Sequence, residues 1–253
     1  MIVLCSGEGP SDIGANDYNS TSGIYDTPKF GAMGNMLLSI LQKCREDYHD
    51  SDCHIIIHKK ELQKRADEIS TLFLSGIDRP AGCAYFIKAA YSLALIALDK
   101  QNCSKDDVIA VLFRDSDPSS EAGNVLWKNK FKSIEDGFKL ARFEFGVPMV
   151  PKPTSEAWCL AMFNASPSVC RKLEEKINRD ELKHDLDNKL FDEHITKEEF
   201  YHRILTGELP LTELKDMNSF AVFQDKLCNA LRKLDNAKCY QCNIDAYDNK
   251  KWR

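Results

Sequence analysis

Four short apolar runs alternate with segments of helical periodicity over the first 150 residues, and this order most constrains the fold. The runs cover residues 2–5, 54–58, 107–113 and 146–150, and each is ended by polar residues, glycine or proline. Helical periodicity is expected over 35–47, 60–75, 83–100 and 133–145. Strands that alternate with helices in this way predict an α/β fold, with a mostly parallel, Rossmann-like sheet flanked by helices.

The remainder of the chain differs in character, because the strand signal disappears after residue 155. Helical spacing is expected over 156–164, 166–178, 180–191, 196–205 and 218–235. We therefore predict an α/β domain over residues 1–165 and an all-helical C-terminal extension over residues 166–253. The polar segment from Ser11 to Gly34 is longer than an ordinary connection, which favours a functional loop.

Composition and charge narrow the classes of function. No apolar run reaches the ~18 residues that a bilayer span needs, so no membrane association is expected. The first eight residues lack a basic segment followed by a long apolar stretch, so we expect no signal peptide and a cytoplasmic location. The net charge is −5. Any contact with nucleic acid therefore requires a local basic surface or a partner that supplies one.

One such basic surface is indicated between the third and fourth apolar runs. Lys128, Lys130 and Lys132 alternate there with Trp127 and Phe131. Lysines with interleaved aromatic side chains are typical of a strip that binds the phosphate backbone and stacks bases. The alternative is the solvated side of a helix whose apolar residues face inward.

Acidic residues follow three of the predicted strands. Glu8 and Asp12 follow the first strand, Asp115 and Asp117 follow the third, and Glu156 follows the fourth. Ligands of open parallel sheets bind beyond the carboxyl ends of the strands, so these side chains are expected to converge. Converging carboxylates suit Mg²⁺ or Mn²⁺. An Asp-x-Asp by itself is also compatible with a turn or a helix cap.

These motifs carry a family resemblance. The segments Glu8-Gly-Pro-Ser-Asp12 and Asp115-Ser-Asp117, each closing a buried strand, resemble the Toprim domain of topoisomerases, bacterial primases and overcoming-lysogenisation-defect (OLD) nucleases. The segment Ser155-Glu-Ala-Trp158 is similar to the additional acidic position of stand-alone, OLD-like Toprim proteins. The resemblance covers residues 1–165 and implies a Toprim-like catalytic domain that gathers divalent metal ions for phosphodiester chemistry.

The resemblance and the charges together imply a metal-dependent nuclease that hydrolyses phosphodiester bonds of DNA or RNA. One ion would be held by Glu8 and Asp12, and a second by Asp115, Asp117 and Glu156. Glu8, Asp115 and Asp117 are therefore also expected to be catalytic.

Two cations beside the acids are expected to neutralise the scissile phosphate, namely Arg114, which would contact the nucleic acid, and Lys152, which would be catalytic. For each the alternative is a surface charge or a salt bridge. The sequence contains no Gly-rich loop ending in Gly-Lys-Ser/Thr, so no ATP site is evident. Stand-alone nucleases of this type resemble effectors of phage defence, and the resemblance implies an ATPase partner in antiviral defence.

Two other classes of function fit part of the pattern. A haloacid-dehalogenase-like phosphatase would use Asp115 as its nucleophile and Asp117 as its acid. A non-enzymatic module, stiffened by a metal ion, would regulate a larger complex. Replacement of Glu8 separates the nuclease from the phosphatase, because only the nuclease requires that residue.

Overall fold

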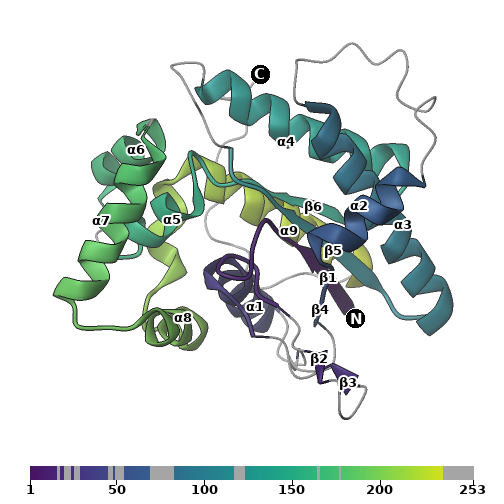
Figure 1. Ribbon diagram of the computed structural model, residues 1–253, viewed down its shortest axis with the longest axis horizontal. Coiled ribbons are helices and arrows are strands. Elements are labelled where there is room, and N and C mark those ends of the chain that lie inside the picture. The colour runs from purple at the N-terminus through teal and green to yellow at the C-terminus, as the bar shows by residue number, and fades with distance from the viewer. Residues whose placement is uncertain are drawn as a thin grey trace.

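A sheet of four parallel strands forms the centre of the molecule, as the computed structural model shows (Figure 1). The structure describes residues 1–15, 18–19, 24–25, 29–44, 48, 54–68, 83–116, 123–163, 166–176 and 178–235. The strands are β1 (Ile2–Ser6), β4 (His54–Ile56), β5 (Val108–Phe113) and β6 (Gly146–Met149), in the spatial order β4-β1-β5-β6. All neighbouring pairs in this sheet are parallel. The predicted α/β class with a parallel sheet is confirmed.

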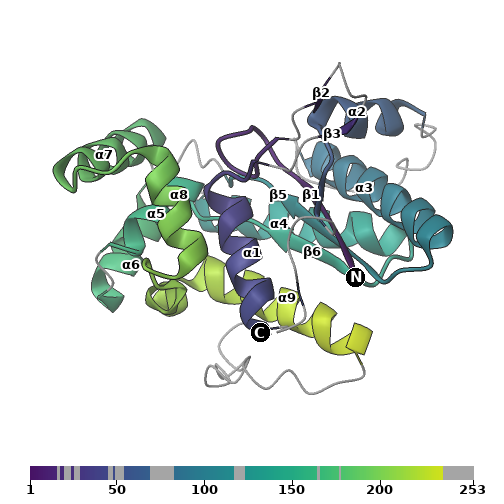
Figure 2. The ribbon, with the colours of Figure 1, turned by 90° about the horizontal axis from the view of Figure 1, so that it is seen from below.

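Helices cover both faces of this sheet (Figure 2). One face carries α2 (Lys59–Asp67), α3 (Cys83–Ser104) and α4 (Gly123–Leu140), and the other carries α1 (Ala32–Cys44) and α9 (Asn218–Asp235).

The residues of β5 explain why both faces are covered. Val111 packs into the apolar cluster on the α1 face, and its neighbour Leu112 packs into the cluster on the α3 face. Successive side chains of a strand point to opposite faces, and every residue of β5 is apolar and fully buried. A strand of this composition requires a helical layer on each side.

Two segments differ from the sequence prediction. Helix α4 begins at Gly123 instead of residue 133. The lysines at 128, 130 and 132 interrupt the apolar spacing of Trp127 and Phe131, which both pack toward the α3 face. The helix ends at Leu140, shortly before Arg142, whose left-handed φ of 55° does not continue a helix. The predicted loop 11–34 contains a short antiparallel pair, β2 (Tyr18–Asn19) and β3 (Ile24–Tyr25). Strands of two residues are too short to show a periodic pattern.

The helices predicted after residue 155 are present in the structure. They are α5 (Ser155–Ala161), α6 (Pro167–Glu175), α7 (Arg179–Asp192), α8 (Lys197–Thr206) and α9, with a 3₁₀ helix, η2 (Leu211–Asp216), before α9. Helices α5 to α8 gather on the left in Figure 1, whereas α3 lies on the right.

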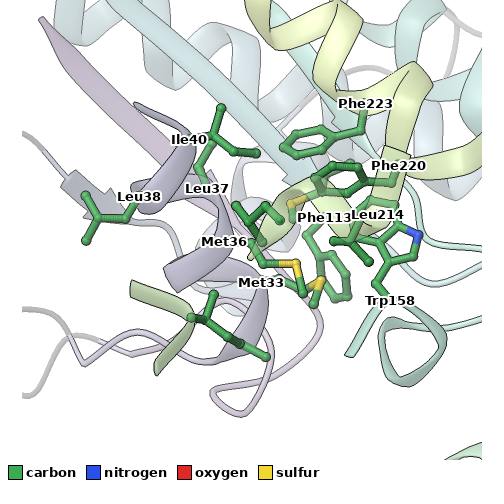
Figure 3. Packing of buried hydrophobic residues seen from close by; sticks show 14 of the residues in the cluster. Met33, Met36, Leu37, Leu38, Ile40, Phe113, Trp158, Leu214, Phe220 and Phe223 are labelled. Carbon is green, nitrogen blue, oxygen red and sulfur yellow. The ribbon is translucent and has the colours of Figure 1, made fainter. Parts of the chain in front are cut away.

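The C-terminal helices share the apolar core of the sheet (Figure 3). Met33 of α1, Phe113 of β5, Trp158 of α5 and Phe220 of α9 belong to one cluster. The rings of Trp158 and Phe220 meet edge to face, with centroids 5.1 Å apart. The division of the chain at residue 165 stays a prediction, because this cluster contains residues from both sides of it.

Candidate active site

The order of the strands places a reversal of the chain's direction across the sheet between β1 and β5. The chain passes from β1 to β4 on one side of the sheet, and from β5 to β6 on the other side. Ligands of doubly wound sheets bind at such a reversal, beyond the carboxyl ends of the strands. Ser6, the last residue of β1, pairs with Leu112 of β5. Glu8 and Asp115, each two residues beyond its strand, therefore lie at the same edge.

Asp12 is fixed near this edge by the start of α1. Its backbone carbonyl accepts hydrogen bonds from the N–H groups of Met33 (2.8 Å) and Gly34 (3.1 Å). These N–H groups lie in the first turn of the helix, where they have no partner within the helix. Gly31 permits the approach, because a Cβ atom there would lie 2.3 Å from the carbonyl oxygen of Ser11. The turn that carries Asp12 is thereby held against α1.

Ser155, at the start of α5, contacts acidic residues from three separate segments. Its backbone N–H donates to Oδ1 of Asp115 at 2.9 Å. Its hydroxyl lies 3.2 Å from Oδ1 of Asp12 and 3.5 Å from Oε2 of Glu156, and can donate to only one of them at a time. Ser155 is buried, so these contacts form below the surface. The ends of β1 and β5 and the start of α5 meet at this residue.

The acidic side chains repel one another. Burial raises the pKa of Asp12 to about 6, and the neighbouring carboxylates of Glu156 and Glu8 act in the same direction. The hydrogen bond from Ser155 and the positive charge of Arg179 oppose this rise in pKa. A raised carboxyl pKa among like charges is the situation that a bound cation relieves.

The negative charges of these acids also raise the pKa of two neighbouring residues, Cys159 and Tyr201. Burial raises the pKa of the Cys159 thiol, and the carboxylates of Glu156, Asp12 and Asp115 add to that effect. Burial also raises the pKa of Tyr201 to about 12, with the carboxylates of Asp12, Glu198 and Glu156 acting in the same direction. The carboxylate of Asp115 therefore influences the same thiol as the carboxylates of Asp12 and Glu156.

The carboxylate side chains of these acids are suitable ligands for a hard divalent cation. Carboxylate oxygens from several segments are the ligands that Mg²⁺ and Mn²⁺ prefer. In the described part of the chain, no group of three or more His, Cys, Asp or Glu side chains is arranged to hold a metal ion. Asp117, one of the predicted ligands, lies outside the described residues. Of the five predicted acids, Asp12, Asp115 and Glu156 lie within hydrogen-bonding distance of Ser155, and the carboxylate of Glu8 acts electrostatically on Asp12.

The predicted basic residues lie in different places. Arg114 is buried, with 1% of its surface exposed, and it donates to the carbonyl oxygen of Phe113 and to the hydroxyl of Tyr85. Nζ of Lys130 lies 3.4 Å from the backbone oxygen of Asp115. These two cations therefore lie beside the end of β5.

Of the other three lysines, Lys128 and Lys132 lie on α4, and Lys152 follows β6. Lys128 and Lys152 line a cavity of about 300 Å³ together with Trp127 and Arg171. Lys132 forms an ion pair with Asp136 at 3.2 Å and lines a groove between α4 and α9.

The aromatic residues between these lysines are oriented inward. Phe131 packs in the core on the α3 face, and the indole N–H of Trp127 donates to the carbonyl oxygen of Val150 at 2.7 Å. Phe131 faces inward, as the alternative interpretation of this segment predicted. Its ring is therefore not available for stacking on bases. The contacts of Lys128, Lys130 and Lys132 with nucleic acid stay predictions.

Sequence reasoning missed three residues of this site. Ser155 belongs to one of the motifs, but the sequence assigns no role to its hydroxyl or its backbone N–H. Arg179 of α7 and Tyr201 of α8 come from helices whose sequence has no pattern that links them to the end of β1. Only the folded arrangement of α5, α7 and α8 brings them to the acids.

Comparisons with known proteins identify no relative of this chain. No protein-family model matches the chain, and searches of curated proteins and of solved structures give no match either. None of the helices in the described ranges has the length and apolar character needed to cross a membrane.

Proposed function

We propose that this protein is a divalent-metal-dependent nuclease of the Toprim type, which hydrolyses phosphodiester bonds of DNA or RNA. The observation that carries the proposal is the convergence of Asp12, Asp115 and Glu156 on Ser155 at the reversal point of a parallel sheet. Three acids from distant segments are placed where such folds bind their ligands. Glu8 contributes to the negative charge around Asp12.

The chain's own residues have distinct parts in this proposal. Glu8, Asp12 and Glu156 offer carboxylate oxygens to a cation, and the hydroxyl of Ser155 orients Asp12 toward it. Asp115 is oriented by the first N–H of α5, which fixes one of its oxygens at 2.9 Å. Asp117 is the further ligand that the sequence motif predicts. When bound, Mg²⁺ or Mn²⁺ supplies a more acidic water and stabilises charge on the phosphate oxygens.

The test is a nuclease assay on single- and double-stranded DNA and RNA with Mg²⁺ or Mn²⁺. We expect Glu8→Ala and Asp115→Ala to lower the rate of cleavage by about 100-fold or more. Asp106→Ala, which removes an exposed acid at the opposite end of β5, is the matched control and should cleave as the unaltered protein does. Full activity of either site variant, with unchanged folding, contradicts the proposal.

The same assay separates the other classes of function. A phosphatase that uses Asp115 as its nucleophile would survive Glu8→Ala and would act on small phosphate monoesters. A non-enzymatic module would leave every nucleic acid intact, even with its partner present. The nuclease alone requires both residues.

A partner with ATPase activity is part of the proposal. The full sequence contains no Gly-rich phosphate loop ending in Gly-Lys-Ser/Thr, and its net charge is −5. A partner would supply nucleotide hydrolysis and additional basic surface for the substrate. The resemblance of the motifs to stand-alone Toprim nucleases, which act in phage defence, implies such a partner. Cleavage that rises when the partner and ATP are added together would support this assignment.

A further inference from the structure

A group of cations surrounds two aromatic rings at the start of α3, next to the end of β5. We call it the cationic cluster; its members are Lys59, Tyr85, Phe86, Arg114 and Lys130. The guanidinium of Arg114 lies 5.7 Å from the centre of the Tyr85 ring, and Nζ of Lys59 lies 5.9 Å from it. Nζ of Lys130 lies 5.1 Å from the centre of the Phe86 ring. Three positive charges are thus gathered around these two rings.

The positive charge of Arg114 has no acidic partner among the described residues. Its side chain is buried, its Nε has no hydrogen-bond partner, and neither Arg114 nor Lys59 forms an ion pair with an acid of the described chain. A buried cation without an acidic partner carries a free-energy cost that an anionic ligand would offset.

The aromatic member of the cluster that faces outward is Tyr85. It is 37% exposed and, with Phe191, is one of two large hydrophobic side chains that the described residues expose. Its ring lies between cations, and its hydroxyl accepts from Nη2 of Arg114 at 3.4 Å. An exposed aromatic ring among cations is the arrangement on which proteins stack the bases of unpaired nucleic acid.

The cluster also adjoins the acids. Arg114 directly precedes Asp115, and Nζ of Lys130 lies 3.4 Å from the backbone oxygen of Asp115. A strand held by the cluster would therefore continue toward the carboxyl edge of the sheet, where Asp115 meets Ser155.

We propose that the cationic cluster binds an unpaired nucleic-acid strand. Its phosphates contact Lys59 and Lys130, one base stacks on Tyr85, and the buried Arg114 positions the Tyr85 ring. The inference rests on the proposed function, because it defines the path by which a substrate strand reaches the acids. Contacts of this kind read the backbone and the face of any base, so the site selects single strands without selecting a sequence.

The test measures binding by fluorescence anisotropy, with the full chain, a labelled single-stranded oligothymidine and its duplex form, in EDTA so that nothing is cleaved. The unaltered protein should bind the single strand more tightly than the duplex. Tyr85→Ala should weaken binding by about tenfold, whereas Tyr85→Phe, which keeps the ring, should bind as the unaltered protein does. Lys59→Gln should lower the slope of log affinity against log salt concentration by about 0.7.

Two control variants match these changes. Phe191→Ala removes the other exposed ring, on α7, and Lys100→Gln removes a lysine from α3, about 22 Å along the helix from Tyr85. Both should bind as the unaltered protein does. The inference is overturned if the unaltered protein binds no single strand, if Tyr85→Ala and Lys59→Gln bind normally, or if the controls lose as much affinity as they do.

Failure of this inference can be told apart from failure of the proposed function. If the unaltered protein cleaves nucleic acid and the cluster variants bind and cleave normally, the cluster is not the substrate path and the nuclease stands. If the cluster variants lose binding but Glu8→Ala cleaves at the full rate, the binding surface stands and the proposed site of hydrolysis is wrong.

Discussion

Ser155 is the residue that connects the acids of this site. Its backbone N–H fixes Asp115, and its hydroxyl lies within reach of both Asp12 and Glu156. The hydroxyl cannot donate to both carboxylates at once, so their repulsion is only partly relieved. In the absence of a cation, the burial of Asp12 beside Glu156 and Glu8 therefore lowers the stability of the protein.

A substitution at Asp12 tests that statement. Burial and the neighbouring carboxylates raise the pKa of Asp12 from 3.8 to about 6 in the folded protein, so ionisation above that pH opposes folding. In EDTA at pH 8, Asp12→Asn should raise the free energy of unfolding by roughly 2 kcal/mol, measured by urea denaturation. Below about pH 4 the carboxyl is protonated in both states, and the gain should vanish.

The matched control for this change is Asp106→Asn, at an exposed position of the opposite edge, where no gain is expected. An Asp12→Asn variant that is no more stable than the unaltered protein at pH 8 would show that the acids do not oppose one another.

The elements of the sheet could be predicted well from the sequence. Each strand is a short apolar run that ends abruptly, and β5, buried on both faces, has the clearest pattern. The start of α4 could not be predicted, because lysines on its exposed side interrupt the apolar spacing. The approach of Asp12 and Asp115 to Ser155 could be predicted from their places at strand ends, whereas the positions of Arg179 and Tyr201 depend on how α7 and α8 pack.

A buried carboxylate connects three of the helices. Oε1 of Glu174, in α6, accepts hydrogen bonds from the N–H (2.7 Å) and the hydroxyl (2.6 Å) of Ser219, at the start of α9. The indole N–H of Trp158, in α5, donates to the same hydroxyl at 2.8 Å. Burial raises the pKa of Glu174, with the hydrogen bonds from Ser219 opposing the rise.

The raised pKa of Glu174 makes the free energy of unfolding depend on pH. The folded protein holds the proton of Glu174 more tightly than the unfolded chain does, so stability should fall as pH rises above the usual value of 4.5. Glu174→Gln keeps an acceptor for Ser219 and removes this charge. The difference in urea midpoint between Glu174→Gln and the unaltered protein should therefore grow in favour of the variant from pH 4 to pH 8. A difference that stays constant over this range would contradict the assignment.

At the scale of the whole molecule, the C-terminal helices complete the core of the sheet. Phe220 and Phe223 of α9 pack in the same cluster as Val147 and Met149 of β6 and Trp158 of α5. Because α9 covers one face of the sheet, its removal would expose a row of buried apolar side chains to water.

Truncation tests how far the two predicted parts of the chain depend on each other. A fragment of residues 1–165 should lack a cooperative thermal transition. In the full chain, Phe223→Ala should lower the free energy of unfolding by about 3–5 kcal/mol. The measurements are calorimetry of the fragment and urea denaturation of the variant. A fragment that unfolds with a sharp transition would show that the helices after residue 165 are a separate extension.

The most direct test of the central claim measures whether the converging acids form one site for a divalent cation. Titration calorimetry with Mn²⁺ should show binding to the unaltered protein, and the affinity should fall at least about tenfold in Glu8→Gln and in Asp115→Asn. Asp106→Asn should bind Mn²⁺ as the unaltered protein does. Equal Mn²⁺ affinity in all four proteins, or no binding to the unaltered one, would contradict the account.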